Sequence, residues 1–277
     1  MKRAGVMGWP VAHSRSPLLH SFWLKEHRID GEYVLLSVRP EELAPSLRGL
    51  AVRGFAGCNL TIPHKEAALA IVDVVDAASA RIGAVNTVIV RPDGALEGRN
   101  TDAFGFRENL RAAQPGWRAG AGPAVVLGAG GAARAVVAAL LDDGVRDIRL
   151  VNRGRDRAAA LAAALGGPIE VVDWARRAEA LAGAALLVNA TSLGQTGQPP
   201  LELALDALPK EALVNDIVYV PPETPLLAAA RRRGNPAVDG LGMLLHQARP
   251  AFAAWFGVTP EVTPALRQAV AASLVKR

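Results

Sequence analysis

The sequence predicts an α/β protein made of two domains. Three observations carry this prediction: short apolar runs alternate with helical stretches, one run after residue 122 is continuously apolar, and the connecting segment 114–122 is rich in Gly, Ala and Pro. The 277 residues suit two domains of ordinary size, each with material for a buried core. A hydrophobic fraction of 51% and a charged fraction of 21% exclude a disordered chain.

Strands and helices alternate in the first half of the chain. Strands are expected at 4–7, 33–38 and 58–62, a hairpin at 84–90 and 95–99 around Pro92-Asp93-Gly94, and helices at 17–27, 41–53, 65–72 and 102–113. Ser16 is the expected N-cap of the first helix, because Pro17 then occupies the first helical position. The second helix is expected to end at Gly54. These elements predict a mixed, mainly parallel sheet.

The alternation restarts with the strand 124–127. Its hydrophobicity is continuous, as in a parallel strand buried on both faces. The elements that follow imply crossover connections and a parallel sheet: strands 148–152, 170–172, 185–189 and 212–217, and helices 132–141, 156–165 and 226–233. Two last helices, 241–256 and 264–275, are expected to return to the first domain. We therefore expect one domain of residues 1–101 plus 239–277 and a second of 102–238, with a cleft between them.

Charge and cysteine usage exclude several classes of protein. The net charge is +5, but Lys and Arg are dispersed, aromatic residues are 5% of the chain, and the longest basic run, 231–233, lies where a helix should end. We therefore expect small anionic ligands and no nucleic acid. The single Cys58, and five histidines without the spacing of a metal triad, predict no disulfide and no metal site. Neither a membrane span nor a signal peptide is expected, so the predicted location is the cytoplasm.

A glycine-rich turn follows the strand 124–127 and opens the next helix. Its residues fit the pattern G-x-G-x-x-A: Gly128, Ala129, Gly130, Gly131, Ala132 and Ala133. Gly128 suits the tight turn, Gly130 lets a pyrophosphate approach the backbone, and Ala133 allows close packing of helix on strand. The N–H groups of the helix N-terminus favour an anion. The turn therefore predicts a dinucleotide site.

The end of the next strand indicates which dinucleotide is bound. An NAD site usually has an acid about 20 residues after the glycine turn, to hold the ribose hydroxyls. This chain instead has the run NRGRDR at 152–157. Guanidinium groups bind a 2′-phosphate through charge-assisted hydrogen bonds, so the run favours NADP over NAD, with Arg153 and Arg157 preferred over Arg155. The alternative is a solvated arginine turn.

Polar residues gather at strand ends in the first domain. They are Ser14, Ser16, Asn59, Thr61, Lys65, Asn86, Asn100 and Asp102. Such residues suit a small ligand rich in hydroxyl groups. Taken alone, Lys65 would be a surface lysine and Asp102 the N-cap of a helix.

Seven blocks of the sequence resemble the motifs of shikimate dehydrogenases and occur in the family's order. They are GWPVAHSRSP at 8–17, NLTIPHKE at 59–66, GAVNT at 83–87, NTDAFG at 100–105, the glycine turn, NATS at 189–192 and DGLGMLLHQ at 239–247. The resemblance implies a substrate domain and a Rossmann-type NADP domain. It also implies the reversible, NADPH-linked reduction of 3-dehydroshikimate to shikimate, on the route to chorismate and the aromatic amino acids.

The resemblance also implies roles for individual residues. Lys65 and Asp102 would be the catalytic pair. The substrate would be bound by Ser14 and Ser16 through its carboxylate, by Asn59, Thr61, Asn86 and Gln247 through its hydroxyls, and by Tyr219. The cofactor would be bound by Gly128, Ala129, Gly130, Gly131 and Ala132 at the pyrophosphate, by Asn152, Arg153 and Arg157 at the 2′-phosphate, by Thr191 and Ser192 nearby, and by Gly240 and Met243 at the nicotinamide. Three residues depart from the commoner family pattern: Trp9, His64 and Gly154.

Two alternatives to this function stay open at the level of sequence. One is a quinate/shikimate dehydrogenase of broader specificity, and the other is an NADP-binding sensor without catalysis. Retention of both Lys65 and Asp102 disfavours the sensor. The expected partner is the small-molecule substrate, and a homodimer is left open.

Overall fold

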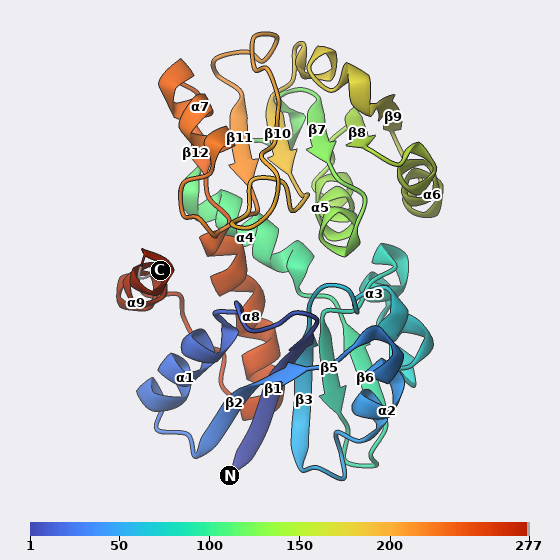
Figure 1. The fold of residues 1–277 in the computed structure, drawn as a ribbon, viewed down its shortest axis with the longest axis vertical. Coiled ribbons are helices and arrows are strands. Elements are labelled where there is room, and N and C mark those ends of the chain that lie inside the picture. The colour runs from blue at the N-terminus through green and yellow to red at the C-terminus, as the bar shows by residue number, and fades with distance from the viewer. Residues whose placement is uncertain (276–277) are drawn as a thin grey trace. The chain divides into compact units, whose positions relative to one another are not determined.

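The structure is a computed structural model that describes residues 1–275, and its chain forms two compact units. The first unit comprises Met1–Gly105 with Leu244–Val270, and the second comprises Phe106–Met243 with residues 271–275 (Figure 1). Helices α4 (Asp102–Ala113) and α8 (Leu241–Phe256) each contribute residues to both units. Within residues 1–275, no helix is long and apolar enough to cross a membrane.

The first unit is built on a six-stranded sheet with the order β2-β1-β3-β5-β6-β4. The strands are β1 (Lys2–Gly8), β2 (Gly31–Ser37), β3 (Phe55–Leu60), β4 (Val74–Val75), β5 (Thr87–Val90) and β6 (Leu96–Arg99). β1 pairs in parallel with β2 and β3, whereas β5 is antiparallel to β3 and β6. The expected hairpin is therefore confirmed, and Gly94 takes a φ of +85° in its turn. The sheet is mixed, as the sequence predicts.

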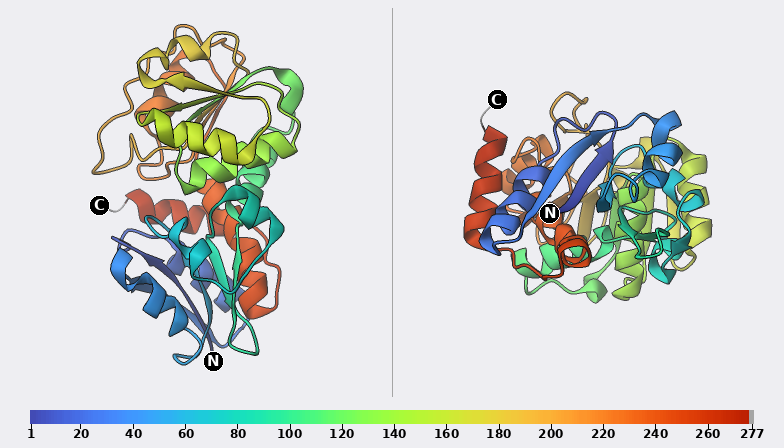
Figure 2. Two further views of the ribbon diagram at one scale, coloured as in Figure 1. Left: turned by 90° about the vertical axis from the view of Figure 1, so that its right-hand side faces the viewer. Right: turned by 90° about the horizontal axis from the view of Figure 1, so that it is seen from below.

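Helices pack against the sheet of the first unit. α1 (Ser16–Glu26) and α8 meet in a cluster of aromatic rings around Trp23 and Phe252, and Trp255 Nε1 donates a hydrogen bond to the Val88 carbonyl at 3.0 Å. The red C-terminal segment before α9 (Pro264–Val275) runs next to α1 in Figure 2, and Trp23 Nε1 donates to the Glu261 carbonyl there at 2.9 Å. A separate core cluster forms under α2 (Leu43–Arg48) from residues such as Leu43 and Leu47.

Several local predictions in the first unit are wrong. Ser16 is the first residue of α1 and not its N-cap, which is Arg15, without a side-chain capping bond. The helix expected at 41–53 is a 3₁₀ turn followed by α2, which ends at Arg48 because Gly49 is a poor helix former. The helix expected at 65–72 is only the 3₁₀ turn Ala67–Ala70, because this short segment cannot form a stable isolated helix. The strand β4 and the helix α3 (Ala77–Ile82) were not predicted.

The second unit is built on a fully parallel sheet with the order β12-β11-β10-β7-β8-β9. Its strands are β7 (Ala124–Leu127), β8 (Ile148–Asn152), β9 (Ile169–Asp173), β10 (Leu186–Asn189), β11 (Leu213–Asp216) and β12 (Ala237–Val238), of which β12 was not predicted. All four residues of β7 are buried, which confirms the interpretation of its continuous hydrophobicity. The chain crosses from one side of β7 to the other between β9 and β10, and ligands bind at the carboxyl ends of strands at such a switch point.

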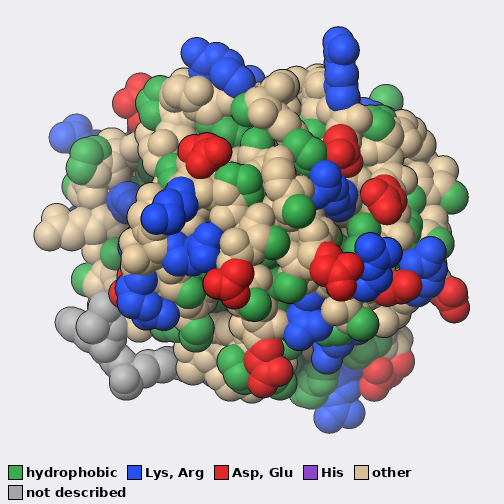
Figure 3. All heavy atoms as spheres, turned by 90° about the horizontal axis from the view of Figure 1, so that it is seen from above, with side chains coloured by type: hydrophobic (Ala, Val, Ile, Leu, Met, Phe, Trp, Pro, Cys, Tyr) green, Lys and Arg blue, Asp and Glu red, His purple; other side chains and the backbone are tan. Residues whose placement is uncertain are grey.

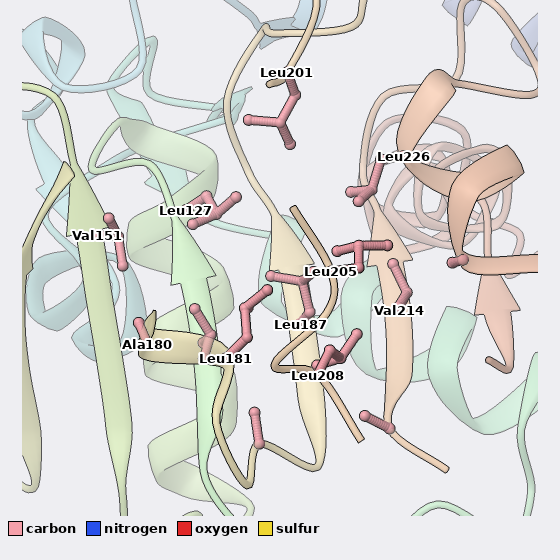
Figure 4. Packing of buried hydrophobic residues seen from close by; sticks show 14 of the residues in the cluster. Leu127, Val151, Ala180, Leu181, Leu187, Leu201, Leu205, Leu208, Val214 and Leu226 are labelled. Atoms are coloured by element: carbon pink, nitrogen blue, oxygen red, sulfur yellow. The ribbon is translucent and has the colours of Figure 1, made fainter. Parts of the chain in front are cut away.

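The helices α5 (Gly131–Asp142), α6 (Arg155–Leu165) and α7 (Pro225–Arg233) lie wholly within the second unit. Thr224 caps α7 by accepting a hydrogen bond from the Leu227 N–H, with Pro225 at the first helical position, and Gly234 ends the helix at a φ of +88°. Leucines from neighbouring strands and from the segments that cover the sheet interdigitate in one core cluster, including Leu127, Leu187 and Leu208 (Figure 4). This core holds the carboxyl ends of the strands in a fixed arrangement.

Candidate active site

In the first unit, polar residues converge at the ends of three adjacent strands. Asn59 lies near the end of β3, Asn86 lies directly before β5, and Asp102 opens α4 shortly after β6. Because β5 pairs with both β3 and β6, these side chains come together from segments distant in sequence. Gln247 joins them from α8. Asn59, Asn86, Asp102 and Gln247 are all buried.

The Lys65 ammonium group lies 2.5 Å from Asp102 Oδ2. The side chain of Lys65 is 17% exposed and that of Asp102 is 6% exposed, so the pair is largely withdrawn from solvent yet reachable at the lysine. Asp102 is not the N-cap of α4 through its own side chain. Its N–H donates to Asn100 Oδ1 at 3.0 Å, which leaves the Asp102 carboxylate to accept from Lys65 and, at 2.8 Å, from Asn86 Nδ2.

Asn86 is the centre of this network. Its Oδ1 accepts from the Thr101 N–H at 2.8 Å, which orients the amide group. Its Nδ2 then faces Asp102 Oδ1, Thr101 Oγ1 at 3.0 Å and Gln247 Oε1 at 3.3 Å. A buried network in which each member has partners is rigid, so Lys65 is presented in one orientation.

Tyr33 is a residue of this site that the sequence reasoning missed. It is buried in β2, and its hydroxyl donates to Asn59 Oδ1 at 2.7 Å. Asn59 Nδ2 in turn donates to the Asn86 carbonyl and to Thr87 Oγ1, both at 3.1 Å. A buried tyrosine requires a hydrogen-bond partner for its hydroxyl. A tyrosine in a strand that is expected to be buried therefore indicates a polar group nearby.

The other residues predicted to hold the substrate lie at the ends of β1 and β3. Ser14 and Ser16 follow β1, and Ser14 Oγ accepts from the Ser16 N–H at 3.3 Å. Thr61 follows β3, and a Cβ at Gly8 would lie 2.4 Å from Thr61 Cγ2. Glycine at position 8 therefore permits the close approach of Thr61 to β1.

In the second unit, the glycine turn has the shape and polarity that a pyrophosphate requires. Gly128 takes a φ of +112°, and a Cβ there would lie 2.7 Å from the Ala190 carbonyl oxygen. A Cβ at Gly130 would meet only Arg157 Nη2 at 4.0 Å, so this backbone borders open space. Gly130 caps α5 without a side-chain bond, which leaves N–H groups of the first turn available to an anion. Ala129 is buried, whereas Gly131 and Ala132 are half-buried in that first turn. These residues fit a bound NADP.

The arginines that follow β8 differ in their surroundings. Arg155 Nη1 lies 2.5 Å from Asp173 Oδ1 and is thereby engaged. Arg153 and Arg157 are exposed, and Arg157 lies beside the glycine turn. Asn152 Nδ2 donates to the Gly154 carbonyl at 2.8 Å and so holds the turn between strand and helix.

Tyr219, which is predicted to bind the substrate, and the remaining predicted cofactor residues lie in segments that follow β10, β11 and β12. Thr191 Oγ1 donates to Asn189 Oδ1 at 2.7 Å, and Ser192 follows it, half-buried. Tyr219 is half-buried in the segment after β11. A Cβ at Gly240 would lie 2.1 Å from the Ile217 carbonyl oxygen, so only glycine allows the chain to pass there. Met243 is buried in α8.

Comparison with known protein families shows which family this chain is related to. Residues 6–88 match the substrate-binding domain of shikimate dehydrogenase, residues 118–196 match shikimate/quinate 5-dehydrogenase, and residues 240–271 match the C-terminal domain of shikimate 5′-dehydrogenase. The NADP(+)-dependent shikimate dehydrogenase of Paramagnetospirillum magneticum is 64% identical over 264 residues, which are 95% of this chain and 96% of that protein. The enzyme of the same description from Rhodospirillum rubrum is 61% identical over 271 residues, with 96% of each chain covered.

The chain belongs to the shikimate dehydrogenase family. Among solved structures, the shikimate 5-dehydrogenase of Thermus thermophilus in complex with NADP(H) and shikimate matches with a TM-score of 0.87 and 41% identity, over 99% of this chain and all of that one. The quinate dehydrogenase of Corynebacterium glutamicum in complex with NAD matches with a TM-score of 0.90 and 31% identity, over 98% of this chain and 99% of that one. The two-domain α/β fold expected from the sequence is thus the fold of the family.

One further polar residue of this shikimate dehydrogenase family member escaped the sequence reasoning. Asp216 ends β11, is buried, and accepts a hydrogen bond from Asn189 at 2.9 Å. The signal was present, because the pair Asn215-Asp216 interrupts an otherwise apolar run at the carboxyl end of a predicted parallel strand.

Proposed function

We propose that this chain catalyses the reversible, NADPH-linked reduction of 3-dehydroshikimate to shikimate, on the route to chorismate and the aromatic amino acids. Residues 1–101 with 239–277 form the substrate domain of this proposal, and residues 102–238 form the NADP domain. The observation that carries it is the buried network in which Lys65, Asp102 and Asn86 are joined within hydrogen-bond distance.

Lys65 is the proton donor in this proposal. Reduction of a ketone leaves a developing alkoxide, which needs a positive charge and a proton. The Lys65 ammonium group provides both, and the Asp102 carboxylate orients it and stabilises its charge at 2.5 Å. Asn86 keeps Asp102 Oδ1 occupied, so the carboxylate presents Oδ2 to the lysine. When bound, NADPH supplies the hydride.

The substrate is held by the polar groups around this pair. Ser14 and Ser16 bind its carboxylate, and Asn59, Thr61, Asn86, Gln247 and Tyr219 contact the rest of the molecule. In support, Asn59 and Gln247 are linked to Asn86 by hydrogen bonds, so one rigid group of amides faces the hydroxyls.

The cofactor is held by the second unit. Gly128, Ala129, Gly130, Gly131 and Ala132 bind the pyrophosphate, and Asn152, Arg153 and Arg157 bind the 2′-phosphate. Thr191 and Ser192 lie near the cofactor, and Gly240 and Met243 lie near its nicotinamide. On the face seen in Figure 3, Lys and Arg side chains are interspersed with Asp and Glu and form no continuous basic stripe, in keeping with a small-molecule partner.

The test follows reduced-nicotinamide absorbance with shikimate and quinate, each with NADP and with NAD. Turnover with shikimate and NADP is expected to dominate. Comparable turnover with quinate would favour a quinate/shikimate dehydrogenase of broader specificity. The similarity to the quinate dehydrogenase structure is the observation that supports this alternative. No turnover in any combination would favour a sensor. The cytoplasmic location and the homodimer stay predictions, to be checked by cell fractionation and analytical ultracentrifugation.

A further inference from the structure

A buried carboxyl group at the end of β11 has no role in the function proposed above. Asp216 is 0% exposed. Its Oδ1 accepts hydrogen bonds from Asn189 Nδ2 at 2.9 Å and from the Val218 N–H at 3.0 Å, and its Oδ2 accepts from the Thr224 hydroxyl at 2.7 Å. The carboxyl group thereby joins the end of β10, the turn after β11 and the start of α7.

Two of these partners, Asn189 and Val218, lead into segments assigned to ligand binding. Asn189 Oδ1 accepts from both the N–H (3.1 Å) and the hydroxyl (2.7 Å) of Thr191, while Asn189 Nδ2 faces Asp216. Asp216 therefore sets the orientation of the amide that holds Thr191. Val218, whose N–H is bound by the same oxygen, directly precedes Tyr219.

The same group also influences the glycine turn. Ala190 follows Asn189, its N–H donates to the Leu127 carbonyl at 2.8 Å, and its carbonyl oxygen lies 2.7 Å from the position that a Cβ of Gly128 would take. A rotation of the Asn189 amide would therefore disturb the wall of the turn that borders the pyrophosphate.

We propose that Asp216 is a positioning residue: its carboxylate holds the loop 190–194 and the turn 217–220 in the arrangement that NADP binding and reduction require. This inference rests on the proposed function, because it concerns the same cofactor site.

The ionisation of Asp216 is the property that makes this role testable. Both of its oxygens accept hydrogen bonds, and the donors are an amide, a backbone N–H and a hydroxyl, all uncharged. Glu223, which precedes the Asp216 partner Thr224, and Arg231 of α7 pair with each other at 2.6 Å at the surface. Burial raises the pKa of Asp216 to about 6. A protonated carboxyl has one fewer acceptor site, so one of the three hydrogen bonds must be lost or rearranged when the group takes up a proton.

The experiment compares the wild type with Asp216→Asn, which has nearly the same shape and resembles the protonated acid. NADPH affinity is measured by the fluorescence of bound NADPH, and kcat and KM are measured from pH 5.5 to 8.5. At pH 8 we expect the Kd of NADPH to rise about tenfold in the variant, the size expected for weakening a hydrogen bond to a charged group. Below about pH 6 the affinity should fall more steeply in the wild type than in the variant, because the 2′-phosphate of NADPH also takes up a proton in this range and affects both proteins.

The matched control is Asp206→Asn in the same unit, since the Asp206 side chain is 94% exposed, and its Kd should equal that of the wild type. Thr224→Val, which retains the carboxylate but removes one donor, should shift the Kd in the same direction by less. A Kd and a pH profile unchanged in Asp216→Asn would overturn the proposal. NADPH binding is measured without substrate, so an inactive wild type would refute the proposed function while leaving this comparison intact.

Discussion

Removal of the Tyr33 hydroxyl is the sharpest test of how the substrate network is held. In Tyr33→Phe the ring stays, and with it the stacking on His20, whose ring centroid lies 3.9 Å away with parallel planes. Only the hydroxyl is lost, and with it the 2.7 Å hydrogen bond to Asn59 Oδ1. Tyr33 and Asn59 are 4% and 5% exposed, so water cannot easily replace the donor.

The expected magnitude follows from that burial. An acceptor left unsatisfied in the interior costs about 1–3 kcal/mol, so the free energy of unfolding should fall by this amount. The Asn59 amide also loses one of its restraints, because its Nδ2 bonds to the Asn86 carbonyl and to Thr87 then act alone. We therefore expect the KM for shikimate to rise about threefold to tenfold, corresponding to roughly 1 kcal/mol of lost orientation.

The assay is urea unfolding followed by circular dichroism, with steady-state kinetics on the same preparations. Ser37→Ala is the matched control, because it deletes an exposed hydroxyl from the same strand and should leave both quantities unchanged. An unfolding free energy for Tyr33→Phe within about 0.5 kcal/mol of the wild type would refute the reasoning, since surface-like substitutions have effects of that size.

Three other predictions follow from the site. Lys65→Met should lower turnover by about 10²–10⁴-fold with unchanged NADPH binding by fluorescence, whereas the exposed Lys210→Met should be silent; near-normal turnover would remove Lys65 from catalysis. Arg153→Ala should raise the KM for NADP about 10–100-fold without affecting NAD, and the control Arg155→Ala, whose arginine pairs with Asp173, should change neither. Burial raises the pKa of Asp216 from 3.8 to about 6, so between these values the folded state retains a proton that the unfolded state has lost. The wild type should therefore lose up to about 3 kcal/mol of stability as pH rises from about 4 to about 6. In urea unfolding, the unfolding free energy of Asp216→Asn relative to that of the wild type should rise across this range, and a constant difference would contradict the raised pKa.

The sequence by itself predicted most elements of the second unit and the place of its candidate phosphate site. The strands 124–127 and 148–152 and the helices 102–113 and 241–256 have the predicted bounds. These segments are long or strongly patterned, so their local signal suffices. The glycine turn could also be predicted from the sequence, because its residues are contiguous and their spacing is typical of a phosphate-binding turn.

Short helices were decided by tertiary packing. The helix pattern at 65–72 has too few residues to form without support from the rest of the fold, and the segment became a 3₁₀ turn. The same limit applies to β4 and β12, which are two residues long and exist through pairing with a neighbouring strand.

The site networks were likewise decided only in three dimensions. Motif resemblance placed Lys65, Asp102 and Asn86 in one site, but that Asn86 orients Asp102 follows from the pairing of β5 with β6. The support of Asn59 by Tyr33 joins residues 26 positions apart, and that of Asn189 by Asp216 joins residues 27 positions apart. A side chain's local sequence does not specify such distant partners. Strand order and register bring the donors and acceptors together, and burial then makes each hydrogen bond obligatory.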